Sequence, residues 1–115
     1  MTAPMPRVAN LAEAAALLGA YPDKGLELWS PERAAEVQGV LWFVMLQHAV
    51  RADFPDRDPV IVLDCGDRGD LAIEAFRLGL RSVALNAPPG VTAKVAEVAA
   101  AYGGQLHAES AQSLA

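Results

Sequence analysis

The stretch at residues 59–70 constrains the fold most, because it joins a strand to a helix through a polar turn. It begins with an apolar run in which residues 60–62 are all β-branched. Such a run, bounded by proline and glycine, is typical of a buried strand in a parallel sheet. A polar, glycine-containing turn follows, and a helical pattern starts at Leu71. The stretch therefore predicts half of a βαβ unit, and sites in such folds gather where strands end.

The rest of the chain predicts an α/β fold with four parallel strands that alternate with helices. Crossovers between parallel strands are right-handed almost without exception, so strands added in sequence order place every crossover on one face. The other face then lies bare or curls into half of a barrel. The predicted strands are 26–29, 60–64, 82–86 and 105–109, and the predicted helices are 10–20, a helix from Ser30-Pro31-Glu32 that Gly39 interrupts, 40–52, 70–78 and 91–102.

Composition and charge exclude several classes of protein. The 115 residues are 53% hydrophobic, which favours one folded domain over residues 1–115. A formal net charge of −5 argues against nucleic acid or an anionic membrane as partner. The longest uncharged run, 37–50, is too short and too polar to span a bilayer. A single cysteine, Cys65, fits a reducing cytosol, so we expect a cytoplasmic protein.

Four segments share a pattern that extends over residues 8–110. A strand ending in Ser leads into a small-residue helix at 28–35, and Val-Leu-Asp-Cys-Gly stands at 62–66. An Ala-Phe-x-x-Gly-x-x-Ser-Val run covers 75–86, and a looser Ala-x-x-Gly run covers 100–109. In this order the segments resemble the N-terminal half of the class II fructose- and tagatose-bisphosphate aldolases, which are zinc-dependent (β/α)8 barrels. The resemblance implies half of an aldolase-type barrel.

The departures from this family bear on chemistry. By the resemblance, Cys65 stands where the family has a zinc-binding His, Val62 replaces another His, and Asn86 replaces an Asp. The family's later zinc-binding histidines and glycine-rich phosphate loops have no counterpart in the sequence. A catalytic zinc needs about three protein ligands. We therefore expect no metal, no cofactor and no aldolase reaction by that mechanism.

The candidate site lies where the strands end. Alternation places Val62 and Asp64 on one face of the sheet, with Leu63 and Cys65 on the other. By the resemblance, Asp64 faces the barrel interior and matches the family's acid/base aspartate, which makes it the catalytic candidate. The alternative is a carboxylate that accepts backbone N–H bonds in its own turn. The predicted ligand-binding residues are Ser30, Asp64, Asp67, Arg68, Asn86 and Glu109.

Several of these residues have simpler interpretations. Arg68 binds an anion or is a solvated loop charge, and Asp67 is also typical of a turn. Cys65 is a metal ligand, a nucleophile or, in the favoured interpretation, a small buried residue. His107 and Glu109 lie on one strand face and could join Cys65 in a metal site, although no other feature of the sequence indicates a metal.

The helix expected at 40–52 raises the question of partners. Trp42 and Phe43 are adjacent, so they cannot both face one side; the helix is buried all round or part of it meets a partner. His48 on this helix is typical of a packed or interface histidine. A bare sheet face and two open edges favour a homodimer, in which the first strand of one chain pairs with the last strand of the other and closes a barrel. The competing arrangements cover the bare face with helix 10–20 or form a dimer through the Trp42 helix.

The function expected from the sequence is that of a non-catalytic, aldolase-like protein that binds a small polar or phosphorylated metabolite or acts as an interaction module. One alternative is a lyase whose active site is completed by a second subunit. Another is a structural subunit of a larger complex.

Overall fold

The computed structural model describes residues 6–108. Its four strands are all parallel and stand in the spatial order β1-β2-β3-β4, which confirms the predicted topology. The strand bounds match the prediction to within one residue, and Glu109, the predicted end of the last strand, lies outside the described residues. In chain order the elements are α1 (Leu11–Ala20), β1 (Glu27–Trp29), α2 (Ala34–Val37), α3 (Val40–Asp53), β2 (Val60–Asp64), α4 (Gly69–Arg77), β3 (Ser82–Leu85), α5 (Pro89–Ala101) and β4 (Gln105–Ala108).

Asn10 caps the start of α1. The Asn10 side chain accepts a hydrogen bond from the Glu13 backbone N–H at 2.9 Å, and Glu13 in return accepts one from the Ala9 N–H at 2.7 Å. The first bond satisfies an N–H group that a helix leaves without an internal partner, and the second ties the residue before the cap to the first turn.

The start of α2 differs from the prediction. The sequence Ser30-Pro31-Glu32 was expected to begin a helix with Ser30 as its cap, but α2 begins at Ala34. The Ser30 hydroxyl instead donates to the Pro31 carbonyl and accepts the Asp64 N–H at 2.8 Å, so it links the ends of two strands. Arg33 precedes the helix with a left-handed φ of 55°, which a helix running from Pro31 would not contain. Gly39, at φ 96°, separates α2 from α3 as the sequence predicted.

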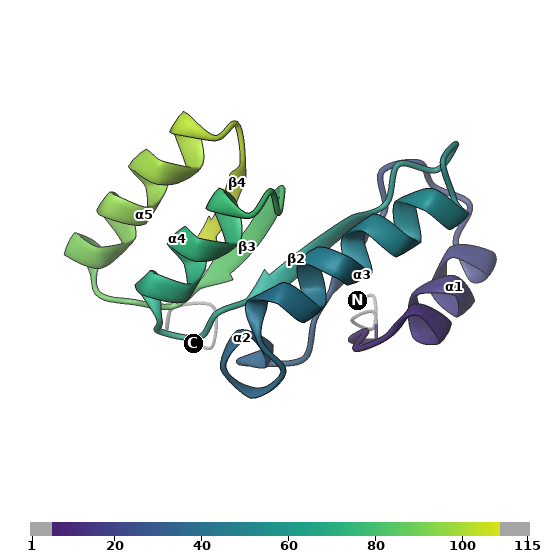
Figure 1. The fold of residues 1–115 in the computed structure, drawn as a ribbon, viewed down its shortest axis with the longest axis horizontal. Coiled ribbons are helices and arrows are strands. Elements are labelled where there is room, and N and C mark those ends of the chain that lie inside the picture. Colours follow the sequence, from purple (N-terminus) through teal and green to yellow (C-terminus); the bar gives the residue numbers. More distant parts are fainter. Residues whose placement is uncertain (1–5, 109–115) are drawn as a thin grey trace, which may run out of the picture.

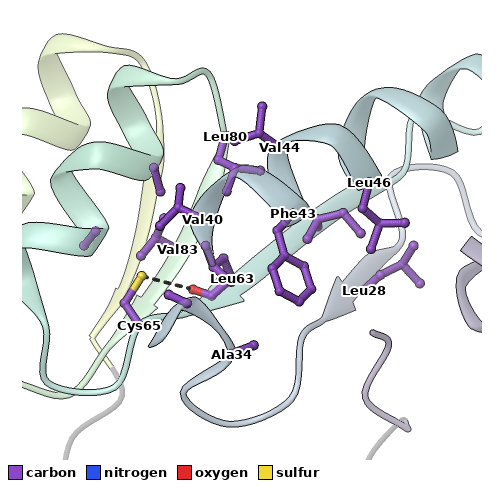
Figure 2. Packing of buried hydrophobic residues seen from close by; sticks show 14 of the residues in the cluster. Leu28, Ala34, Val40, Phe43, Val44, Leu46, Leu63, Cys65, Leu80 and Val83 are labelled. Carbon is purple, nitrogen blue, oxygen red and sulfur yellow. Dashed lines mark hydrogen bonds between the residues drawn. The ribbon is translucent and has the colours of Figure 1, made fainter. Parts of the chain in front are cut away.

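One face of the sheet is covered by helices. α3, α4 and α5 lie side by side over the strands (Figure 1). Strand side chains that point to this face form one core with the helices, and Figure 2 shows Phe43 pointing from α3 toward the strands. The strands contribute five fully or almost fully buried residues to this core: Leu28, Ile61, Leu63, Val83 and Leu85.

The opposite face of the sheet carries Val62 and Ala84, which alternate with those core residues. They are 0% and 1% exposed, yet they are not part of the helix-side core. α1 does not cover them: it packs against α3, and its buried Leu17 and Leu18 belong to the helix-side core. The arrangement in which the N-terminal helix covers the second face is therefore not the one observed.

Two ring side chains on the outer strands cover these residues. The outer strands of a four-stranded sheet are about 14 Å apart, because neighbours are spaced by about 4.8 Å, so both rings have to lean over the two strands between them. Here the Trp29 ring on β1 and the His107 ring on β4 meet edge to face, with centroids 5.1 Å apart. The register places Val62 beside Trp29 and Ala84 beside His107, so the two rings meet over the apolar residues between them. We call this side the concave face.

The N-terminal segment takes part of the free edge of β1. The Val8 N–H donates to the Trp29 carbonyl at 2.8 Å, and the Val8 side chain is fully buried. A barrel-closing dimer needs this same edge, so its formation would require Val8 to move. Among residues 6–108, no helix is long and apolar enough to cross a membrane.

A buried glutamine fixes the start of β2. The Gln47 side chain, 5% exposed, donates to the Pro59 carbonyl and accepts the Ile61 N–H, each at 2.9 Å. β2 pairs with β3 only from Val62 onward, so the Ile61 N–H needs another acceptor. Gln47 explains why a polar residue interrupts the apolar run of α3.

Candidate functional site

Asp64, the predicted catalytic residue, is held by backbone groups. Its Oδ1 accepts the N–H of Gly66 at 2.9 Å and the N–H of Arg33 at 3.2 Å. This is the turn geometry that the sequence offered as the alternative to catalysis. Its Oδ2 lies 4.0 Å from Nη1 of Arg7, and the side chain is 18% exposed. One carboxylate oxygen is thus used in the fold, and the other faces a cation.

Asp67 and Arg68, predicted to bind a ligand, make ion pairs within the chain. Arg68 contacts both carboxylate oxygens of Asp70 at 2.8 and 2.9 Å. These hydrogen bonds raise the pKa of Arg68 and lower the pKa of Asp70. Asp67 accepts from Arg33 at 2.8 Å, and Arg33 also contacts Glu36 at 3.1 Å. Both loop residues are exposed, and each has its charge matched by a neighbour.

Cys65 lies under the turn with its side chain on the helix side. It is fully buried, and its Sγ lies 3.9 Å from the Leu63 carbonyl (Figure 2). Burial, and then the nearby charge of Asp64, raises the pKa of the thiol to about 12. A nucleophile or metal ligand needs the thiolate, which this environment opposes. Within residues 6–108, no three His, Cys, Asp or Glu side chains form a group that could hold a metal ion.

The other predicted ligand-binding residues lie in three different settings. Ser30 is fully buried and bonds to the backbone, as described above. Asn86 is exposed after β3, and its backbone N–H donates to the Gly66 carbonyl at 2.7 Å. Glu109 lies outside the described residues, so the proposed partnership of His107 with Glu109 is untested. Of the candidates within residues 6–108, Asp64 through its side chain and Ser30 through its carbonyl contact Arg7, which belongs to a larger polar group.

That larger group lies on the concave face and its rim, and we call it the concave cluster: Arg7, Glu27, Trp29, Asp64, Ser82 and His107. Its members touch in series. Arg7 lies near Asp64 and over the Trp29 ring, 5.4 Å from the ring centroid. Trp29 contacts His107, whose Nε2 is 2.9 Å from the Ser82 hydroxyl and 3.5 Å from Glu27 Oε2. The cluster joins β1, β2, β3, β4 and the N-terminal segment.

The geometry of the concave cluster limits its chemistry. Ser82 is 1% exposed, so a substrate cannot reach its hydroxyl. Ser82 and Glu27 also approach the same nitrogen of His107, whereas a serine relay needs the base and the acid on opposite ring nitrogens. The group is better suited to binding, since Arg7, Trp29, Glu27 and His107 offer a cation, an aromatic surface, a carboxylate and an imidazole.

Sequence reasoning missed four members of this cluster: Arg7, Glu27, Trp29 and Ser82. Alternation from Asp64 could have indicated that Glu27 and Trp29 share its face, because the paired register aligns Trp29 with Val62. Contact between the first and last strands depends on how far the sheet curls, and no local pattern in the sequence encodes that.

No protein-family model, curated protein or solved structure matches the chain. The fold and the cluster thus define the class on their own: a four-stranded, wholly parallel α/β domain with a polar group on its concave side.

Proposed function

We propose that this chain is an aldolase-like half-barrel that binds a small polar metabolite at the concave cluster and does not perform metal-dependent cleavage. The observation that carries the proposal is the contact between Trp29 and His107, because it joins polar side chains of all four strands on one face. Sites in parallel α/β folds lie at the carboxyl ends of strands, and Asp64 and His107 stand at or near that end.

The curl of the sheet supports the half-barrel part of the proposal. A barrel interior is filled by alternating side chains from neighbouring strands. Val62 and Ala84 fill that position here, and the paired order β1-β2-β3-β4 is the order of consecutive barrel strands.

The charges favour a neutral polar ligand over a phosphorylated one. A phosphate needs cations that can turn toward it, and arginine is the usual choice. Arg33 and Arg68 are bound to carboxylates, while Arg7 donates to the Ser30 carbonyl at 3.1 Å and faces Asp64. Glu27 and Asp64 add negative charge to the same side. A ligand with hydroxyl groups can hydrogen-bond to these carboxylates and to the imidazole and can pack on the indole face. The carboxylates would repel a phosphate dianion.

Fluorescence tests the proposal, because the chain has two tryptophans and two histidines. In a Trp42→Phe background, Trp29 is the sole indole, and we expect its emission to change when fructose is titrated in. We expect fructose 1,6-bisphosphate to give a weaker response. A His107→Ala change should abolish the response, whereas His48→Ala, on the exposed side of α3, should leave it unchanged.

Two results would contradict the proposal. An unchanged Trp29 signal with both sugars would remove the metabolite site. Tightly bound zinc at one ion per chain, lost in Cys65→Ser, would instead favour the lyase whose site is completed by a second subunit.

A further inference from the structure

The N-terminal segment is fixed beside the concave cluster by three consecutive residues, Arg7, Val8 and Ala9, which we call the strap. The Val8 N–H donates to the Trp29 carbonyl at 2.8 Å, and the Val8 side chain is fully buried. The Ala9 carbonyl accepts the indole N–H of Trp42 at 2.8 Å. The backbone of the strap is therefore held at two points, by β1 and by α3.

The bond to Ala9 bears on a question that the sequence left open about α3. Phe43 is fully buried in the helix-side core, whereas the adjacent Trp42 is 48% exposed. The helix is therefore not buried all round, and its exposed indole meets the strap of the same chain.

The Arg7 side chain occupies the positions that a polar ligand of the concave cluster would need. Its guanidinium carbon lies over the Trp29 ring, 5.4 Å from the ring centroid, and its Nη1 lies 4.0 Å from Asp64 Oδ2. The same nitrogen donates to the Ser30 carbonyl at 3.1 Å. One side chain thus takes the indole face, a carboxylate oxygen and a backbone acceptor together.

We propose that Arg7 is an autoinhibitory side chain, which competes with the ligand for the concave cluster and swings away when the ligand binds. This inference rests on the proposed metabolite site. A sugar or another polyol can replace each contact of Arg7, because its hydroxyl groups can donate to Asp64 and to the Ser30 carbonyl while its C–H face packs on the indole. The displaced guanidinium returns to water, to which 43% of the side chain is already exposed.

The anchors of the strap determine how strongly Arg7 competes. A group in the same chain competes at an effective concentration that depends on how closely its tether holds it to the site. The Val8 bond to Trp29 and the Trp42 bond to Ala9 keep Arg7 near the ring even when its side chain swings out. A cation–π contact and a partly exposed ion pair are each weak, so we expect Arg7 to lower the affinity by about threefold to tenfold.

Proton NMR titration with fructose tests the inference, because the chain has two histidines and the imidazole signals of His107 can be assigned with His48→Ala. Arg7→Ala should bind fructose about threefold to tenfold more tightly than the wild type. Arg51→Ala is the matched control and should leave the affinity unchanged. Arg51 is similarly exposed (40%) and is paired with Asp58 at 2.8 Å, outside the concave cluster.

Trp42→Phe gives a second test from outside the site. It removes the indole N–H that holds Ala9 and keeps an aromatic ring, so it should tighten fructose binding by a smaller factor than Arg7→Ala does. In the Arg7→Ala background it should add nothing, because the competing side chain is gone. An effect of Trp42→Phe that persists without Arg7 would overturn the inference.

A measurement without ligand separates this inference from the proposed function. In the Trp42→Phe protein, Trp29 is the sole indole, and acrylamide should quench it more strongly once Arg7→Ala uncovers the ring. Unchanged quenching would overturn the inference. Fructose binding by the wild type, with equal or weaker binding by Arg7→Ala, would also overturn it and leave the metabolite site in place. Stronger quenching with no fructose binding by any variant would instead overturn the proposed function, and the competition with it.

Discussion

The two faces of the sheet bury their apolar residues in different ways, and the adjacent residues Ile61 and Val62 show the difference. Both are fully buried. Ile61 lies in a core formed by a layer of helices, whereas Val62 lies under side chains of its own sheet, beside Trp29 and Ser82. A second layer of helices thus covers one face, and side chains of the sheet's own outer strands cover the other.

The difference shows that equal burial need not mean equal surroundings. On the helix side, Ile61 is packed among apolar groups. On the concave side, the nearest cover includes a hydroxyl, an imidazole and a carboxylate. A polar side chain placed on the concave side can therefore find partners that the helix side lacks.

The largest expected effect comes from placing a carboxylate on each face. We expect Ile61→Asp to abolish folding, because it removes a buried side chain worth about 2–5 kcal/mol and adds an unpaired buried charge. Val62→Asp should cost less and leave the chain folded, since its carboxylate can accept hydrogen bonds from the Ser82 hydroxyl and the His107 imidazole nearby. Urea unfolding followed by circular dichroism measures both.

Ile61→Val is the matched control and should cost about 1 kcal/mol. If Val62→Asp were also unfolded, the two faces would be alike, and the concave side would be a sealed core.

A smaller effect concerns Cys65 on the helix side. Its pKa is raised to about 12 in the folded chain, against about 8.5 in an unfolded one. The thiol therefore keeps its proton to a higher pH in the folded state than in the unfolded one. Its contribution to the free energy of unfolding is constant below about pH 8.5 and is lost as the pH rises toward 12, by at most about 1.4 kcal/mol per pH unit. Urea midpoints at several alkaline pH values should fall less steeply in Cys65→Ala than in the wild type.

The same environment predicts an unreactive thiol. Native protein should fail to react with a disulfide reagent at neutral pH and should react once unfolded. Rapid labelling of the native protein would show that the turn over Cys65 opens.

The smallest expected effect is the coupling between Trp29 and His107. Aromatic pairs of this geometry contribute about 1 kcal/mol beyond the area that they bury. A double-mutant cycle with Trp29→Leu and His107→Leu should therefore return a coupling of about 1 kcal/mol in urea unfolding. The cycle formed by Trp42→Leu and His48→Leu, two exposed residues on α3, should return a value near zero. Zero coupling at Trp29 and His107 would mean that the outer strands do not meet in solution.

Much of the fold was predictable because it depends on local patterns. The β-branched run at 60–62 predicted β2, and Gly39 predicted the break before α3. The alternation of strands with helices predicted the parallel sheet, and the order of the four aldolase-like segments predicted the order of its strands. Ser30 was the exception: the Ser-Pro-Glu pattern predicted a helix cap, but the hydroxyl bonds to the end of β2, a contact 34 residues away that a local pattern does not contain.

The candidate site was less predictable for the same reason. Asp64 was found from its place after a strand, yet its partners Arg7 and Arg33 come from distant segments. Arg68 was predicted to bind a ligand because a cationic side chain in a loop can bind an anion. Its pairing with Asp70 depends on how the turn leads into α4. Predicting the concave cluster requires knowing how all four strands are arranged relative to one another, which no single segment of the sequence specifies.

The sequential strand order has a consequence for how the chain assembles during synthesis. Each strand pairs with the one made immediately before it, so a nascent chain can add one helix and one strand at a time without waiting for a distant partner. The contact between Trp29 and His107 is different, because 78 positions, 107 − 29, separate its partners. It can form only after the last strand has emerged from the ribosome. Quenching of Trp29 by His107 would thus mark the completion of the four-stranded sheet.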